Sequence, residues 1–132
     1  NFYVNGTAGG SSSWNSLSDV RLKKNIRTIP DALNTLMNMR GVSFEWADSN
    51  SPEKGERIGF IAQELEKVLP QVVNTGGDYY SVQYGPINAI LVEAVKEQQK
   101  MIQSLQMQTQ TLMKENEAIK ADLQKLNQSA NK

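Results

Sequence analysis

The chain has 132 residues, and its 14 Lys and Arg balance its 14 Asp and Glu, so the formal net charge is zero. A balanced chain lacks the basic surface that nucleic acids need, and no apolar run approaches the roughly 20 residues that span a bilayer. His and Cys are absent, which excludes a Ser-His-Asp triad, a Cys-His dyad and zinc sites built from these residues. We therefore expect one small domain with an appended element, no metal or other cofactor, and neither nucleic acid nor membrane as a partner.

Residues 1–17 are expected to contain the end of an upstream segment and a linker. The chain starts with Asn1 rather than Met, and residues 1–4 alternate weakly, as at the end of a strand. Gly and Ser dominate residues 6–13, a composition typical of a flexible and exposed linker. We interpret the chain as the C-terminal part of a longer protein.

Ser18 and Lys23 follow this linker and are the strongest candidates for covalent chemistry, since the chain offers no His or Cys. An ordinary lysine has a pKa of about 10.4 and is protonated at neutral pH, so Lys23 could act as a base only if it were desolvated or placed beside a cation. Arg21 and Lys24 could supply that repulsion, whereas Asp19 could either oppose it or orient the lysine. The spacing alone favours a simpler alternative, in which Ser18 and Asp19 cap a turn and Lys23 is solvated.

Residues 18–85 are predicted to form an α+β core, because short helical and strand patterns follow one another. The predicted elements are a helix that starts between Thr28 and Asp31 and ends at Gly41, strands at 42–46 and 57–61, a helix at 63–69 that stops at Pro70, and strands at 71–73 and 79–84. Gly76 and Gly77 between the last two strands permit the positive φ angles that a hairpin needs. This hairpin would extend a small antiparallel sheet.

The side chains of this core are assigned from the same patterns. Phe44, Trp46 and Phe60 are expected to be buried, because they occupy strand positions. Glu64 and Glu66 are expected on the solvated face of a short helix, rather than in a paired-carboxylate site for acid-base chemistry.

Residues 86–132 are predicted to form one long helix from Pro86, because proline is tolerated in a first turn and no Gly or Pro follows. One heptad register persists for about five heptads, as in a left-handed coiled coil roughly 50 Å long at 1.5 Å rise per residue. The a and d positions of this seam are Leu91, Val95, Gln98, Ile102, Leu105, Thr109, Leu112, Asn116, Ile119, Leu123 and Leu126. A solitary amphipathic helix is the alternative, but it would leave its distal half unsupported.

Polar residues in and beside the seam carry further information. Gln98, Thr109 and Asn116 would lower the stability of the coiled coil but disfavour slipped registers. We therefore interpret them as residues that fix the register. Glu115 at g lies five residues before Lys120 at e, the spacing of an ion pair between parallel helices. The heptads leave the number of helices in the coiled coil open, because the apolar layers suit a dimer and the polar layers could suit a trimer.

Several separated blocks of the sequence resemble the peptidase S74 family. They read Ser18-Asp19-Val20-Arg21-Leu22-Lys23-Lys24-Asn25-Ile26, then Gly59-Phe60-Ile61-Ala62-Gln63-Glu64-Leu65 with Val68-Leu69-Pro70, then Tyr84 with Glu93-Ala94 through Glu97-Gln98. The blocks occur in the expected order over about residues 17–99, whereas the helical tail is similar only in kind. Members of this family are C-terminal intramolecular chaperone domains of phage endosialidase tailspikes, tail fibres and neck appendages, and they also occur in myelin regulatory factors.

The resemblance implies a homotrimeric chaperone for an upstream β-rich fibre stem of the same polypeptide, which releases itself by autoproteolysis. It implies Ser18 as nucleophile and Lys23 as general base. Asp19 and Arg21 are candidate orienting residues on the charge argument given above, not on the resemblance. The family's cut corresponds to the Ser18-Asp19 bond, which would require a serine from a neighbouring chain or an activated water. The alternative is the Leu17-Ser18 bond, which the Ser18 hydroxyl can attack through a five-membered ring. Cleavage in cis and in trans both stay open.

The expected fold class is α+β: a small antiparallel sheet with short helices, followed by a long C-terminal helix that forms a parallel trimeric coiled coil. The expected function is a self-cleaving chaperone in the precursor of a virion appendage, assembled in the host cytoplasm and released after cleavage. The alternative function is a trimerisation module without proteolysis, in which Ser18 and Lys23 are structural. A release domain of a membrane-bound transcription factor is disfavoured, because neither a membrane segment nor a basic DNA-binding stretch occurs.

Overall fold

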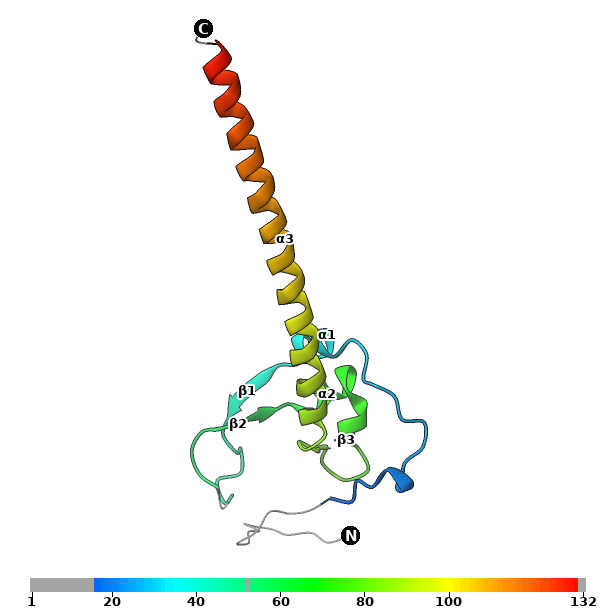
Figure 1. Ribbon diagram of the computed structural model, residues 1–132. Helices are drawn as coiled ribbons and strands as arrows, with labels where there is room; N and C mark the ends of the chain where they lie inside the picture. The colour runs from blue at the N-terminus through cyan, green and yellow to red at the C-terminus, as the bar shows by residue number, and fades with distance from the viewer. Residues whose placement is uncertain (1–15, 52, 131–132) are drawn as a thin grey trace, which may run out of the picture. The chain divides into compact units, whose positions relative to one another are not determined.

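The computed structural model describes residues 16–51 and 53–130 (Figure 1). They pack into two compact units. The first, called the sheet unit below, comprises the described residues up to Ile29 together with Asn38–Gln83. The second, the helix unit, combines Pro30–Met37 with the described residues from Tyr84 onward. Small antiparallel sheets, short helices and a long C-terminal helix confirm the predicted α+β class.

The first sheet of the sheet unit is antiparallel and has two strands, β1 (Gly41–Phe44) and β2 (Arg57–Phe60), close to the predicted positions. Phe44 lies at the end of the sheet where the connecting loop begins, and its ring meets that of Trp46 edge to face at 5.3 Å and 86°. Trp46 is 53% exposed, so its predicted place in the core is wrong. Phe44 and Phe60 are half-buried.

α2 (Ala62–Val68) follows β2 after a single residue and matches the predicted helix closely. Its buried residue is Leu65, and Leu69 and Val72 just beyond the helix are buried as well. The helix ends before Pro70, because proline disfavours helical backbone in the residue that precedes it. These three apolar residues form the core of the sheet unit.

The predicted strand at 71–73 is wrong in its first two residues, because Pro70–Val72 forms a 3-10 turn, labelled η2. Proline is tolerated in the first position of such a turn, where its missing N–H has no partner to lose. β3 (Val73–Asn74) then pairs antiparallel with β4 (Ser81–Val82). This pair is a separate two-stranded sheet, so the hairpin does not extend the first one.

The loop between β3 and β4 turns by a different device from the one predicted. Gly76 and Gly77 do not take a positive φ; among the described residues, Gly55 is the glycine that does, at 78°. The Oδ1 atom of Asn74 accepts a 3.0 Å hydrogen bond from the Gly76 N–H, as in an Asx turn. A side chain rather than glycine conformation therefore shapes this loop.

The helix unit contains α1 (Ala32–Met37) packed against α3 (Ile87–Ala130). α1 is shorter than predicted. It begins after Asp31, whose φ of 53° lies outside the right-handed helical region, and it ends at Met37 rather than at Gly41. The buried residues of this unit are Ala32, Ile87, Ile90 and Ala94.

α3 runs for 44 residues without a break, which corresponds to about 66 Å at 1.5 Å per residue (Figure 1). It begins directly after Pro86, and the Ile87 N–H bonds back to the Tyr84 carbonyl at 3.1 Å. No helix in the described part of the chain is long and apolar enough to cross a membrane.

Candidate functional site

Ser18 and Lys23 lie side by side near the start of the described chain. Lys23 Nζ donates a 2.7 Å hydrogen bond to Ser18 Oγ. One 3-10 turn, η1 (Val20–Leu22), brings the two residues together. The N–H groups of Leu22 and Lys23 close this turn with 3.1 Å bonds to the carbonyls three residues earlier. Local backbone structure therefore converts the sequence spacing of the pair into a direct contact.

Asp19 and Arg21 organise the same turn. Asp19 Oδ1 accepts hydrogen bonds from the backbone N–H of Arg21 at 2.8 Å and from its Nε at 2.9 Å, and Oδ2 accepts from Nη2 at 2.8 Å. The Arg21 side chain and then its backbone N–H hold the pKa of Asp19 below its ordinary value of 3.8, and the carboxylate raises the pKa of Arg21. Asp19 is therefore bound to Arg21, whereas Lys23 is bound to Ser18.

The distance between Lys23 Nζ and Ser18 Oγ suits a general base and the hydroxyl that it would deprotonate. To act in this way the amine must be neutral, so that it accepts the hydroxyl proton. Both residues are exposed in the described chain. The single chain thus supplies the contact and leaves both side chains open to water.

The segment that carries the pair also exposes apolar side chains. Leu17, directly before Ser18, is 90% exposed. Val20, Leu22 and Ile26 are exposed as well. Both candidate bonds, Leu17-Ser18 and Ser18-Asp19, therefore lie in a segment that its own chain leaves uncovered.

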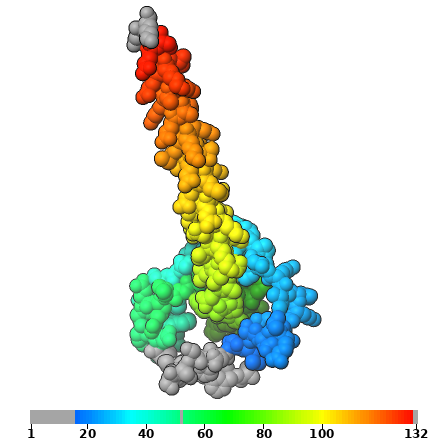
Figure 2. Space-filling view, in the orientation of Figure 1, coloured from blue at the N-terminus to red at the C-terminus, as the bar shows by residue number. Residues whose placement is uncertain are grey.

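Every predicted seam residue of α3 is exposed, from Leu91 to Leu126. The buried residues of the helix, Ile87, Ile90 and Ala94, lie on a different stripe. Figure 2 shows side chains projecting freely along the distal part of the helix. The heptad stripe is therefore a surface that packing within the described chain does not use.

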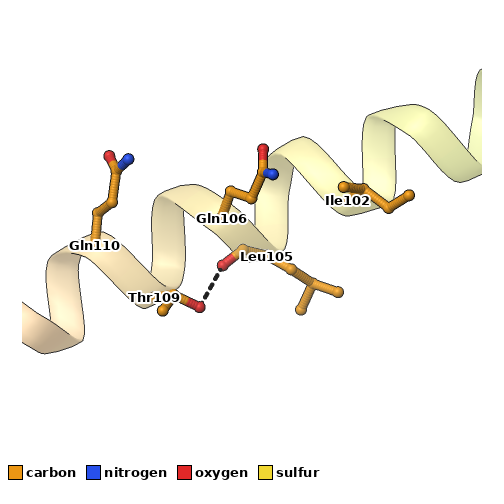
Figure 3. Close-up of a pocket in the computed structure, with 5 residues that line it drawn as sticks. All are labelled: Ile102, Leu105, Gln106, Thr109 and Gln110. Atoms are coloured by element: carbon orange, nitrogen blue, oxygen red, sulfur yellow. Dashed lines mark hydrogen bonds between the residues drawn. The ribbon is translucent and has the colours of Figure 1, made fainter.

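A shallow hollow lies on this seam and is lined by five residues of α3 alone (Figure 3): Ile102, Leu105, Gln106, Thr109 and Gln110. The Thr109 hydroxyl donates a 2.8 Å hydrogen bond to the Leu105 carbonyl oxygen. Thr109 can therefore be buried at an a position without leaving an unpaired hydroxyl donor. A hollow between side chains of one helix face suits a side chain from a neighbouring helix.

Glu97 has a role that its sequence position alone did not predict. Its two carboxylate oxygens accept the backbone N–H groups of Ala32 at 3.1 Å and Leu33 at 2.9 Å, at the start of α1. α3 thereby supplies the cap that α1 lacks in its own sequence. The available signal was the spacing, because Glu97 continues the buried stripe of Ile90 and Ala94 at helical intervals.

Glu64 was expected on a solvated face; its side chain is 42% exposed and pairs with Arg40. Arg40 Nε donates to Glu64 Oε2 at 2.9 Å, and Nη2 binds the other oxygen, so the contact is bidentate. The Arg40 side chain lowers the pKa of Glu64. The pair joins the segment before β1 to the first turn of α2. Among the described residues, no group of three or more His, Cys, Asp or Glu could hold a metal ion.

Residues 18–74 match the sequence model of a family described as chaperone of endosialidase, peptidase S74. This range begins at Ser18 and includes Lys23, the Arg40–Glu64 pair and both sheets except β4.

The chain is also similar to proteins from phages and from an animal. The long tail fiber protein Gp37 of Enterobacteria phage K3 is 36% identical over 85 residues, which cover 60% of this chain and 7% of that protein. The Gp37 of Enterobacteria phage M1 is 31% identical over 117 residues, or 79% of this chain and 46% of that protein. Myelin regulatory factor homolog 1 of Caenorhabditis elegans is 33% identical over 78 residues, or 53% of this chain and 8% of that protein.

The chain thus spans less than half of the length of each of these relatives. The resemblance carried by the motifs is confirmed: residues 18–74 match the chaperone of endosialidase family, and the relatives include long tail fiber proteins of phages.

Proposed function

We propose that this chain is the C-terminal intramolecular chaperone of a phage fibre or tailspike. It promotes folding and homotrimerisation of an upstream β-rich stem of the same polypeptide, and it releases itself by one cleavage at the Ser18-Asp19 bond. The protein is then a virion appendage precursor that is assembled in the host cytoplasm. The family match over residues 18–74 and the fibre-protein relatives support the chaperone role.

The observation that carries the cleavage step is the 2.7 Å hydrogen bond between Lys23 Nζ and Ser18 Oγ. The chain has no His or Cys, so this pair is the available combination of a hydroxyl nucleophile and a base at contact distance. Both residues lie in the segment where the family match begins. A neutral Lys23 amine would take the hydroxyl proton, and the later ammonium would return a proton to the leaving amine.

The bond changes depend on which carbonyl is attacked. The Ser18 hydroxyl cannot reach its own carbonyl carbon without a four-membered ring, so at Ser18-Asp19 the attacking oxygen comes from Ser18 of a neighbouring copy or from a water. The new C–O bond forms, the C–N bond breaks, and Asp19 leaves as a free amine. Water attack yields a carboxylate directly, whereas serine attack yields an ester that a water then hydrolyses. At the alternative Leu17-Ser18 bond, the Ser18 hydroxyl itself forms the ester.

The exposed seam of α3 supports the assembly step. A long helix with regularly spaced apolar residues in water gains stability chiefly by packing that stripe on other helices. Three helices joined in parallel hold three upstream stems at high effective concentration, which speeds a fold rich in contacts between distant residues. Release afterwards leaves the stem without the device that assembled it, so its persistence then depends on slow unfolding.

Cleavage of the full-length protein that contains this chain tests the proposal. We expect the wild type to split near Ser18, and Ser18→Ala and Lys23→Ala to stay intact. Ser16→Ala and Lys54→Ala are matched controls, because they remove the same side chains from exposed positions that have no part in the proposed cleavage. N-terminal sequencing of the C-terminal product identifies the bond: Asp19 first supports the proposed bond, and Ser18 first supports the alternative.

Native mass spectrometry of the same samples tests assembly, with a mass of three chains expected. A stable trimer that stays uncut on long incubation would support the trimerisation module without proteolysis. Normal cleavage of Lys23→Ala would contradict the role of this lysine as the base.

A further inference from the structure

The segment that carries the serine-lysine pair contains one carboxylate followed by two cations. Asp19 lies next to Ser18 in sequence, and Arg21 and Lys23 follow it at alternate positions. Either cation could bind the carboxylate by sequence distance. All three hydrogen bonds that the Asp19 carboxylate accepts in this turn come from Arg21, two from the guanidinium and one from the backbone N–H. The hydrogen bond of Lys23 Nζ goes to Ser18 Oγ instead.

We infer that Arg21 is a positioning residue for the proposed cleavage, because it occupies both carboxylate oxygens of Asp19 and so leaves the Lys23 amine to the Ser18 hydroxyl. The inference rests on the proposed function, since it concerns how the base is kept available. Arg21 touches neither Ser18 Oγ nor Lys23 Nζ, so its effect passes through Asp19.

Guanidinium geometry explains why Arg21 holds the carboxylate. The planar fork of arginine presents parallel N–H donors that match two carboxylate oxygens, whereas the lysine ammonium binds as a single point. Here Nε and Nη2 reach one oxygen each, at 2.9 Å and 2.8 Å. The Arg21 backbone N–H adds a third bond at 2.8 Å and fixes the carboxylate at the start of η1.

A carboxylate released from Arg21 would act against the chemistry in two ways. An anion beside an amine favours its charged form, which cannot accept a proton. An ammonium–carboxylate contact would also draw Nζ away from the hydroxyl, because both acceptors lie within the same short turn. The Arg21–Asp19 pair is exposed, and exposed pairs add little to stability. We expect the pair to matter because it keeps the carboxylate bound to Arg21, so that the Lys23 amine binds the Ser18 hydroxyl.

The competition for the carboxylate takes place within one segment. Lys24 is the next charged residue, and Arg27 follows it. Among the described residues, no charged group of another element forms an ion pair with Asp19, Arg21 or Lys23. The bonds from Arg21 lower the pKa of Asp19, so the carboxylate stays charged and bound over the neutral range.

A double-mutant cycle on self-cleavage of the full-length protein tests the inference. The variants are R21A, D19N and D19N/R21A, with R21K as the variant that keeps the charge but loses the fork. We expect R21A to shift the pH profile of the cleavage rate about one unit to the alkaline side, which slows cleavage about tenfold at pH 7. In the D19N background, the same R21A change should alter the rate less than about twofold, because no carboxylate remains to capture the amine. R21K should fall between wild type and R21A.

Each other outcome has a distinct meaning. R21A cleaving like the wild type, with an unchanged pH profile, overturns the inference and leaves the proposed function standing. Equal slowing by R21A in both backgrounds also overturns it, because Arg21 would then act on the turn rather than through Asp19. An uncut wild type overturns the proposed function and this inference together. Circular dichroism and native mass spectrometry identify any variant that has lost its fold, and R21K then carries the comparison.

Discussion

α3 has two parts that differ in how much of their surface the chain itself covers. In residues 87–97, α1 packs on the helix, three residues are buried, and Glu97 bonds to the start of α1. In residues 98–130, every described residue is exposed. Nevertheless, the apolar heptad stripe runs through both parts, because Leu91 and Val95 are exposed beside the buried stripe.

The difference shows that two stripes of one helix differ in how far the chain itself covers them. The stripe through Ile87, Ile90, Ala94 and Glu97 is packed within the chain, whereas the stripe from Leu91 to Leu126 is exposed and, under the proposed function, packs on other chains. A helix in water gains little from propensity alone, so under the proposed function the exposed part would gain most of its stability from association. Substitutions on the two stripes should therefore have different readouts: folding of one chain for the first, and assembly for the second.

The largest effect is expected from a charge in the seam. We expect Leu112→Asp to weaken trimer association more than about 100-fold, because each buried leucine contributes about 1.5 to 3 kcal/mol and three carboxylates would meet in one layer. Sedimentation equilibrium measures the change. Thr111→Asp is the matched control, since it adds the same charge one residue away at an exposed c position that neither belongs to the seam nor lines the hollow. Equal weakening by both variants would contradict the predicted register.

A smaller effect is expected where the chain covers the helix. Glu97→Ala removes the acceptor of two backbone N–H groups of α1 and should lower the free energy of unfolding by about 1 to 3 kcal/mol. Hydrogen exchange of the Ala32 and Leu33 amides should accelerate with it. Glu117→Ala, the same change in the bare part of α3, should alter unfolding by less than about 0.5 kcal/mol. Unchanged amide exchange in Glu97→Ala would show that the carboxylate is not the cap.

The smallest effect is expected from the carboxylate of the sheet unit. Arg40 lowers the pKa of Glu64 below its ordinary value of 4.5, so this pair stabilises the fold above that pH and the contribution is lost as the pH falls further. Melting temperatures from pH 7 to pH 3 should therefore fall less steeply at the acid end in Arg40→Ala than in the wild type. The difference is small, because both side chains are substantially exposed. If the melting temperatures of the two proteins fell equally steeply at acid pH, the Arg40–Glu64 pair would not contribute to the pH dependence of stability.

Much of the fold followed from local patterns. The long helix was predictable because no Gly or Pro follows Pro86 and the heptads persist, and β1, β2 and α2 appear close to their predicted positions. The errors also have local causes. Pro70 starts a 3-10 turn where a strand was expected, and Asp31 in a left-handed conformation delays α1.

In the candidate site, too, local contacts were predictable from the sequence and distant ones were not. The contact of Ser18 with Lys23 was predictable in kind, because both lie within one short turn whose backbone bonds are local. The sequence did not predict which cation, Arg21 or Lys23, binds Asp19. Both are available by spacing, and side-chain geometry decides between them. The cap from Glu97 was also beyond the motifs, because it joins residues 65 positions apart. Exposure of the seam was implied by the heptads, whereas trimerisation itself stays a prediction.

The distance in sequence between α1 and Glu97 sets an order of events during translation. α1 leaves the ribosome first, and the carboxylate that completes its first turn is made 65 residues later. At about 5 to 20 residues per second, this is a delay of roughly 3 to 13 seconds. Throughout that interval the amide groups at the start of α1 lack the acceptor that they have in the folded chain. Docking of α1 on α3 is therefore a late step of biosynthesis.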